Sequence, residues 1–120
     1  MRVVRARAED GGRRQDLRAT FDLVVARGFA PPPVTAECAA PFLMTGGRLI
    51  VSEPPAEPAS GAGGAAAPGS RWPVAGLARL GLVPERTWSE PFHYRSFVLD
   101  HPCPEDYPRR DGVPAKHPLF

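Results

Sequence analysis

A long run of small residues divides the chain and limits the core that it can build. Residues 54–70 contain only Pro, Ala, Gly, Ser and Glu, without hydrophobic periodicity. Such a run cannot bury enough apolar surface to become ordered, so we expect a flexible surface insertion. Its glycines do not form a phosphate loop, because that loop must leave a strand and open a helix. The core must therefore come from the residues on either side of the run.

The residues before the run predict a strand, a helix and a second strand. Residues 3 and 4 resemble the end of a strand, and the apolar, β-branched run at residues 21–26 predicts a buried parallel strand. Residues 34–43 have apolar positions at helical spacing, and Gly46-Gly47 can end that helix. Residues 48–52 form the next apolar strand. This order with short connections predicts a βαβ unit and an α/β fold.

The residues after the run predict a helix and a β-hairpin. Residues 70–81 begin with a capping serine and end with a glycine, and leucines line one face. Residues 86–89 and 94–100 are rich in β-branched and aromatic side chains, which predicts a strand pair joined around residues 90–91. The proline-rich residues 101–120 are expected to lack regular structure.

Charge and cysteine content exclude few classes of function. The formal net charge of +2 neither requires nor forbids an RNA partner. Cys38 and Cys103 are the only cysteines, and no apolar run of membrane-spanning length occurs. We therefore expect a cytoplasmic protein with reduced thiols and no membrane partner.

Histidines and aromatic residues have more than one interpretation. The spacing of His93, His101 and His117 relative to Cys103 fits no structural zinc pattern, so no metal is expected. Aromatic side chains at helix and strand positions favour the core, and base stacking is the alternative. These aromatic residues are Trp72, Phe92, Tyr94 and Phe97.

Three stretches resemble a known enzyme family. They are the Arg-Ala-Glu at residues 7–9, the strand and its exit at residues 21–30 with the Gly-Gly-Arg at residues 46–48, and the tail at residues 107–119. Together they resemble the small-subunit (16S) rRNA guanine-N7 methyltransferases, of the glucose-inhibited division protein B type. The resemblance covers most of the chain outside residues 54–70. It implies the C-terminal part of a Rossmann-like class I methyltransferase fold, with parallel strands followed by an antiparallel hairpin.

The same resemblance implies a cofactor and residues that bind it. In that family an alanine-glutamate pair and an arginine at a strand end contact S-adenosylmethionine, and the matching positions here are Ala8, Glu9 and Arg27. Ligands of open α/β sheets bind outside the carboxyl ends of the strands, where Glu9 and Arg27 are expected. The alternatives are a surface carboxylate at the start of a helix and a solvated arginine at the end of a strand.

The implied reaction is methylation of guanine N7 in 16S ribosomal RNA. N7 has a free lone pair and loses no proton before attack, so the reaction requires positioning and no catalytic base. No catalytic side chain is therefore assigned. The tail residues Arg109, Arg110 and Lys116 could contact RNA phosphates or form a solvated terminus.

The resemblance also predicts how much of the fold the chain holds. The family's Gly-rich loop and the acidic residue after the second strand have no counterpart, so we expect the chain to begin at the third strand. Glu53 stands where a lysine is expected. Residues 1–100 would form a partial methyltransferase domain, and residues 101–120 an irregular basic tail. The strand at residues 21–26 would then be an exposed apolar edge.

Three functions follow from this interpretation. The first is the rRNA methyltransferase, truncated here and completed by further coding sequence or by a separately encoded N-terminal half. The second is a non-catalytic remnant that binds RNA or a protein partner. The third is a methyltransferase of the same fold with another substrate.

Overall fold

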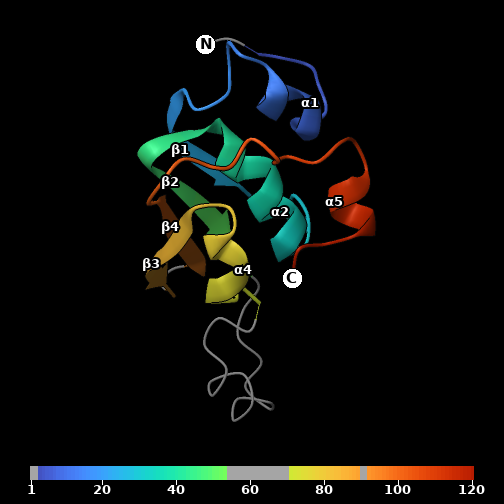
Figure 1. Ribbon diagram of the computed structural model, residues 1–120. Helices are drawn as coiled ribbons and strands as arrows, with labels where there is room; N and C mark the ends of the chain where they lie inside the picture. The colour runs from blue at the N-terminus through green and yellow to red at the C-terminus, as the bar shows by residue number, and fades with distance from the viewer. Residues whose placement is uncertain (1–2, 54–70, 90–91) are drawn as a thin grey trace.

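The computed structural model describes residues 3–53, 71–89 and 92–120 and contains one four-stranded sheet (Figure 1). The strands lie in the order β1-β2-β4-β3, with β1 and β2 parallel and the other pairs antiparallel. The last strand in the sequence thus inserts beside a parallel pair, which confirms the predicted fold class. The strands are β1 (Phe21–Ala26), β2 (Leu43–Ser52), β3 (Leu82–Trp88) and β4 (Tyr94–Leu99).

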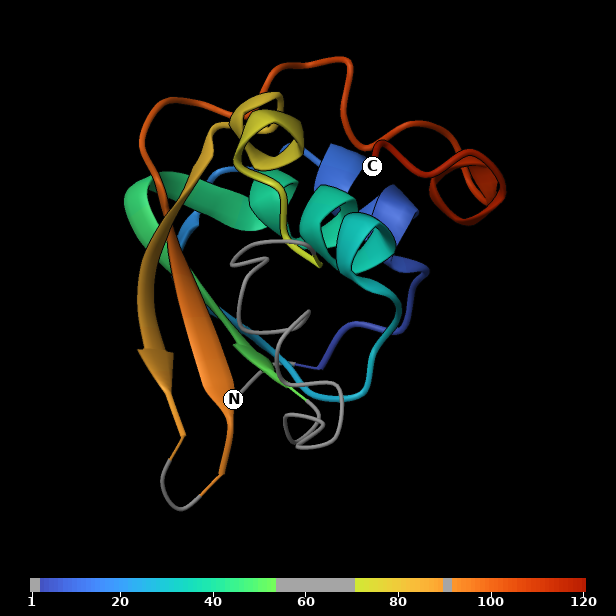
Figure 2. The ribbon, with the colours of Figure 1, turned by 90° about the horizontal axis from the view of Figure 1, so that it is seen from below.

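The helices of the described residues lie on one side of this sheet (Figures 1 and 2). The sheet face toward them is apolar, because register places Leu49 of β2 beside Phe97 of β4, and both are buried. Trp72 packs on Phe97 with ring centroids 4.9 Å apart. Burial of these side chains supplies the main favourable term for folding. The helices are α1 (Ala8–Arg13), α2 (Pro32–Ala39), the 3₁₀ turn η1 (Ala40–Phe42), α4 (Val74–Ala78) and α5 (Val113–Lys116).

The first half of the chain follows the predicted order, with different boundaries. The helix predicted for residues 34–43 ends at Ala39, because Pro41 has no N–H to continue the helical ladder. β2 therefore starts at Leu43, and the glycines expected to end the helix lie inside the strand. Gly47 fits there because a Cβ would come within 2.9 Å of the Met44 carbonyl oxygen.

Two predictions about strands were wrong. Residues 3 and 4 form no strand, because no neighbouring strand is available to them among the described residues. β1 is parallel to β2 as predicted, but it is not buried: Leu23 and Val25 are 50% and 67% exposed. The exposed apolar edge expected at residues 21–26 is confirmed among the described residues.

The hairpin and the helix before it are confirmed in type, with shifted boundaries. α4 is shorter than residues 70–81, and Gly81 ends its turn with φ +90°. β3 begins at once with Leu82, which is fully buried, so the strand starts earlier than residue 86. The predicted insertion at 54–70, including its serine cap, and the turn at 90–91 lie outside the described residues.

The tail, residues 101–120, differs from a free basic terminus because it packs on the domain. The fully buried Glu37 of α2 accepts hydrogen bonds from Arg109: the backbone N–H at 2.8 Å, Nε at 3.0 Å and Nη2 at 2.8 Å. Bidentate pairing matches the planar guanidinium to the carboxylate. Nη2 of Arg109 also donates to the His117 carbonyl, which closes the turn around α5.

A second arginine attaches the tail to the loop before β1. Arg18 donates from Nη1 to the carbonyl oxygens of Gly12 and Tyr107, at 3.2 and 2.6 Å. Its Nη2 donates to the carbonyls of Cys103 and Pro104, at 3.2 and 2.9 Å. Carbonyls of an irregular segment have no ladder partner, and one guanidinium satisfies several of them. These contacts hold the irregular part of the tail. The prediction that residues 101–120 lack regular structure was wrong for residues 113–116, which form the short helix α5 after the left-handed Gly112.

We predict that Glu37→Gln lowers the free energy of unfolding by about 3 kcal/mol, because removing one partner of a buried ion pair leaves the other uncompensated. Glu85→Gln is the control, since the Glu85 carboxylate also binds an arginine, Arg48, but at the surface where water screens the pair. Urea unfolding measures both. Equal losses for the two variants would contradict the assigned role of Glu37.

Candidate functional site

A hollow of about 380 Å³ opens where the parallel strands β1 and β2 end side by side. Such positions favour ligands, because loops and helix starts diverge there from the carboxyl edge of a sheet. Arg27 and Glu53 follow the two strands directly, so both chain exits line the hollow. Its full lining is Ala26, Arg27, Gly28, Phe29, Ala30, Thr35, Val51, Ser52, Glu53, Arg71 and Trp72.

The two charged residues that follow the strands differ in their partners: the Glu53 carboxylate has several, and the Arg27 guanidinium has none among the described residues. Oε1 of Glu53 accepts hydrogen bonds from Trp72 Nε1 at 3.0 Å and from Arg71 Nη1 at 2.8 Å, and Arg95 Nε lies 3.9 Å from Oε2. The Glu53 carboxylate therefore already has hydrogen-bond donors within the hollow. Arg27 is exposed and has no hydrogen bond or ion pair with the rest of the described chain. Its guanidinium can pair with a carboxylate or phosphate of a ligand.

A second, apolar hollow of about 120 Å³ lies along the other side of the β1 end. It shares Ala26, Phe29 and Thr35 with the first hollow, so the two adjoin. Ala8 of α1 lines it, which brings the predicted Ala8 and Arg27 to neighbouring cavities. Cys38 also lines this hollow. Burial raises the pKa of its thiol to about 12, so the thiol stays protonated near neutral pH.

Glu9 is buried and turned toward the tail, and it lines neither hollow. Oε2 accepts hydrogen bonds from the Gly112 N–H at 3.1 Å and from Arg7 Nη2 at 3.3 Å. Burial opposes ionisation, but hydrogen bonds from its own backbone, from Gly112 and from Arg7 outweigh it and lower the pKa of Glu9. In this structure Glu9 joins the start of α1 to the turn before α5.

The three basic tail residues occupy different environments. Arg109 is bound to Glu37 and to the His117 carbonyl, so its guanidinium is largely used inside the fold. Arg110 precedes α5 and Lys116 ends it; both are exposed and make no ion pair with other described residues. Their charges are free to meet solvent anions.

Sequence reasoning missed two contributors to the site. Phe29, 54% exposed, lines both hollows and can offer a ring face at their junction. Trp72 is buried behind Glu53 and fixes its carboxylate. The sequence could have indicated Phe29, because it lies two residues beyond an arginine at a strand end. It could not have indicated the contact between Glu53 and Trp72, because the two residues lie on opposite sides of the 54–70 run.

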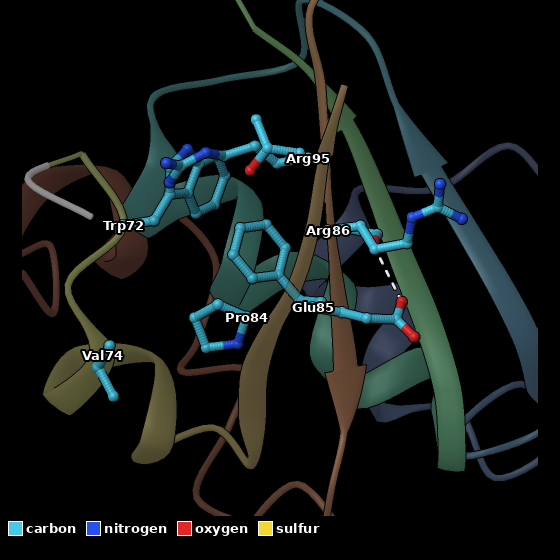
Figure 3. A pocket seen from close by; sticks show the side chains of 9 residues that line it. Trp72, Val74, Pro84, Glu85, Arg86 and Arg95 are labelled. Atoms are coloured by element: carbon cyan, nitrogen blue, oxygen red, sulfur yellow. Dashed lines mark hydrogen bonds between the residues drawn. The ribbon is translucent and has the colours of Figure 1, made fainter. Parts of the chain in front are cut away.

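A third hollow of about 220 Å³ lies between α4 and the β3-β4 hairpin (Figure 3). Trp72, Val74 and Pro84 line one part of it, and Glu85 and Arg86 point away from Trp72. Arg86 lies over the Trp88 ring, 4.8 Å from its centroid. Glu85 is the one carboxylate among the residues that line the hollow, and Thr87 and Ser96 bring hydroxyl groups to it.

Two features, a metal-binding group and a membrane-spanning helix, are absent from residues 3–53, 71–89 and 92–120. No three His, Cys, Asp or Glu side chains gather there in a group that could hold a metal ion. Within the same residues, no helix combines the length and apolar character needed to cross a bilayer.

The sequence is similar to proteins named Ribosomal RNA small subunit methyltransferase G. The protein of Symbiobacterium thermophilum is 40% identical over 98% of this chain and 47% of its own length. The Moorella thermoacetica protein is 36% identical over 94% of the chain and 46% of its own length, and that of Deinococcus deserti 34% over 100% and 48%. The chain thus spans about half the length of the curated relatives it matches. No protein-family model matches it.

We predict that Glu9 makes stability depend on pH on the acid side. Its folded pKa is lowered, so the unfolded chain binds the proton more strongly and the contribution of Glu9 is complete above the unfolded pKa. That contribution is lost as the pH falls through the folded pKa. Glu9→Gln should therefore flatten the acid limb and cost about 1 kcal/mol at neutral pH, the value of a hydrogen bond.

Thermal unfolding between pH 3 and pH 7 checks this, with the exposed Glu105 changed to Gln as the control. An acid limb of Glu9→Gln as steep as that of the unaltered chain would show that Glu9 does not cause it.

Proposed function

The chain belongs to the ribosomal RNA small subunit methyltransferase G family, and on that premise we propose that it is part of an S-adenosylmethionine-dependent enzyme that methylates guanine N7 in 16S ribosomal RNA. One observation carries the proposal beyond the relatives' name. Arg27, which has no partner in the described structure, stands at the joined carboxyl ends of β1 and β2 beside an open hollow. That is where an α/β sheet binds ligands.

The chemistry proposed for this site needs few groups. When bound, S-adenosylmethionine supplies a methyl group on a positively charged sulfur, and this sulfur is the leaving group. Guanine N7 forms the new bond with its own lone pair, so the protein need not remove a proton. The task of the residues is to hold two reactants in line and to keep water away. The apolar hollow agrees with this.

Arg27 and Phe29 after β1, and Ala8 and Glu9 in α1, each have a role in the proposal. Arg27 pairs with the donor's carboxylate or with an RNA phosphate. Ala8 forms the wall of the apolar hollow beside the donor's adenine. Glu9 contributes by holding α1 against the Gly112 turn, so that Ala8 keeps its place. Phe29 lies between the two hollows and stacks on a flat ring.

The RNA contact is proposed for the exposed side of the tail. Arg110 and Lys116 bind phosphates of the ribosomal RNA. Arg109 supports them from beneath, because its ion pair with Glu37 fixes the turn on which both stand. Phosphate contacts would orient the RNA, and the base would be recognised at the strand ends.

A fused protein tests the proposed reaction. We expect methyl transfer to 16S ribosomal RNA when this chain replaces the matching part of the Moorella thermoacetica relative. Arg27→Ala should reduce kcat/KM by about a hundredfold, as expected for loss of a charged contact to a buried reactant. Arg86→Ala, which removes an exposed arginine away from the hollow, should leave the rate unchanged.

Two results would contradict the assignment. A fused protein that binds the donor and the RNA without methylating it would favour the non-catalytic alternative. Full activity of Arg27→Ala would show that Arg27 does not contribute to the site.

Salt dependence tests the RNA contacts. Arg110→Ala and Lys116→Ala should each reduce the slope of log K against log salt by about 0.7 to 0.9, because each releases about one counterion fewer. Filter binding of 16S ribosomal RNA to the same fused protein measures it. Lys116→Arg is the control and should keep the slope; an unchanged slope in both alanine variants would place the RNA elsewhere.

A further inference from the structure

The Glu53 carboxylate is held in one position at the hollow of about 380 Å³ beyond the ends of β1 and β2. Its backbone N–H donates to the His93 carbonyl oxygen at 2.8 Å, so Glu53 extends the ladder between β2 and β4. Its Oε1 accepts a hydrogen bond from the indole of Trp72 at 3.0 Å, and Trp72 is buried against Phe97. The backbone and the carboxylate are therefore both fixed, and a fixed acceptor selects ligands by geometry.

The two carboxylate oxygens of Glu53 differ in their hydrogen bonds. Oε1 has two donors, Trp72 Nε1 and Arg71 Nη1. Oε2 lies 3.9 Å from Arg95 Nε, beyond hydrogen-bond distance, and accepts no hydrogen bond from other described residues. No buried side-chain oxygen or nitrogen of the described residues lacks a hydrogen-bond partner, so Oε2, which lacks one, is open to a ligand. An ionised carboxylate accepts about four hydrogen bonds, so Oε2 has room for two donors.

Two arginines already balance the charge of Glu53. Arg71 is hydrogen-bonded to the carboxylate, and Arg95 of β4 lies close to its other oxygen. A third cation at this carboxylate would be repelled by both guanidinium groups, whereas neutral N–H donors would not. The open positions on Oε2 therefore favour uncharged donors, and the edges of nucleobases present such donors.

We propose that Glu53 selects guanine by accepting hydrogen bonds from its Watson–Crick edge. The proposal rests on the proposed function, because it names the residue that recognises the base. Guanine presents two neighbouring donors on that edge, the ring N1–H and the exocyclic N2–H, whereas adenine presents an acceptor at N1, which a carboxylate repels. N7 lies on the other side of the purine, so contacts at N1 and N2 leave its lone pair free. Enzymes that act on an extruded base read it by this edge.

The rest of the hollow fits the other parts of a nucleotide. Ala26 pairs with Val51, so Arg27 and Glu53 leave neighbouring strands just beyond that pair. Arg27 can bind a phosphate. Phe29 lines the same hollow, is 54% exposed, and can stack on a purine ring. One hollow thus has a cation for the phosphate, a ring for the base and an acceptor for the donors of that base.

A purely structural role for Glu53 is the competing interpretation. A carboxylate that only joins Arg71 and Trp72 to the end of β2 would stabilise the fold. It would not distinguish one purine from another. A comparison of purines that differ in single hydrogen-bonding groups therefore separates the two interpretations.

The test is a titration of the 120-residue chain with guanosine, inosine and adenosine monophosphates. The indole N–H signal of Trp72 in NMR spectra reports binding, because this group donates to Glu53. The chain has two tryptophans, so Trp88→Phe identifies the signal. Inosine differs from guanosine only by lacking the N2 amino group, and we expect it to bind about tenfold more weakly, the effect of one hydrogen bond to a charged acceptor. Adenosine monophosphate should bind more weakly still.

Glu53→Gln should remove the preference for guanosine over inosine monophosphate. The side-chain amide would keep one acceptor for Trp72 and Arg71 and would place an N–H group opposite the donors of guanine. Glu85→Gln is the matched control, because the Glu85 carboxylate is also held by an arginine, Arg48, but does not line this hollow. The control should keep the preference of about tenfold.

Three outcomes overturn the proposal. The first is equal affinity of the unaltered chain for guanosine and inosine monophosphates, a comparison that does not depend on the folding of any variant. The second is an equal loss of affinity for both nucleotides in Glu53→Gln, which would leave Glu53 a structural role. The third is a shift of the Trp72 signal with S-adenosylmethionine and none with guanosine monophosphate, which would assign Glu53 to the ammonium group of the donor.

The titration is independent of the test of the proposed function, because no methyl group is transferred in it. Failure to prefer guanosine monophosphate therefore leaves the activity of the fused protein standing. Loss of that activity leaves the recognition of guanine by Glu53 standing.

Discussion

The ion pair between Glu37 and Arg109 connects α2 to the tail, residues 101–120. Glu37 lies in the middle of α2, inside the core, where a lone carboxylate would be strongly unfavourable. Its oxygens receive three donors from one tail residue, and the tail in turn reaches α1 through Gly112 and Glu9. α2 also carries Thr35 and Cys38, which line the hollows at the strand ends. The geometry of the candidate site therefore depends on a contact made well away from it.

β1 positions the candidate site. Its carboxyl end delivers Arg27 and Phe29 to the hollows, and among the described residues its length offers an unpaired edge and an apolar face. Because Arg27 and Phe29 follow one short strand, the pairing of β1 with β2 decides where both side chains stand.

Much of the fold was predictable from local sequence. The apolar run of β1, the helical spacing of α2 and the paired strands β3 and β4 were each identified in the correct order. Periodicity and turn residues act over a few positions, so the sequence reports them directly. Boundaries were less predictable: the sequence pattern predicts a helix end at Gly46 and Gly47, whereas both lie within β2. The helix ends earlier, at Ala39, because Pro41 cannot continue its hydrogen-bond ladder, and Gly46, with φ +88°, lies where the β1–β2 register shifts.

By itself the sequence determined the type and order of the strands, the parallel pair followed by a hairpin, and the strand-end position of Arg27. These features depend on side-chain pattern along the chain. Tertiary structure alone decided that Glu9 faces Gly112 rather than the hollow, that Arg109 neutralises Glu37, and that Trp72 holds Glu53. Each of these contacts joins residues far apart in the sequence. A charged side chain binds the partner that folding brings within reach, and no local pattern encodes which partner that is.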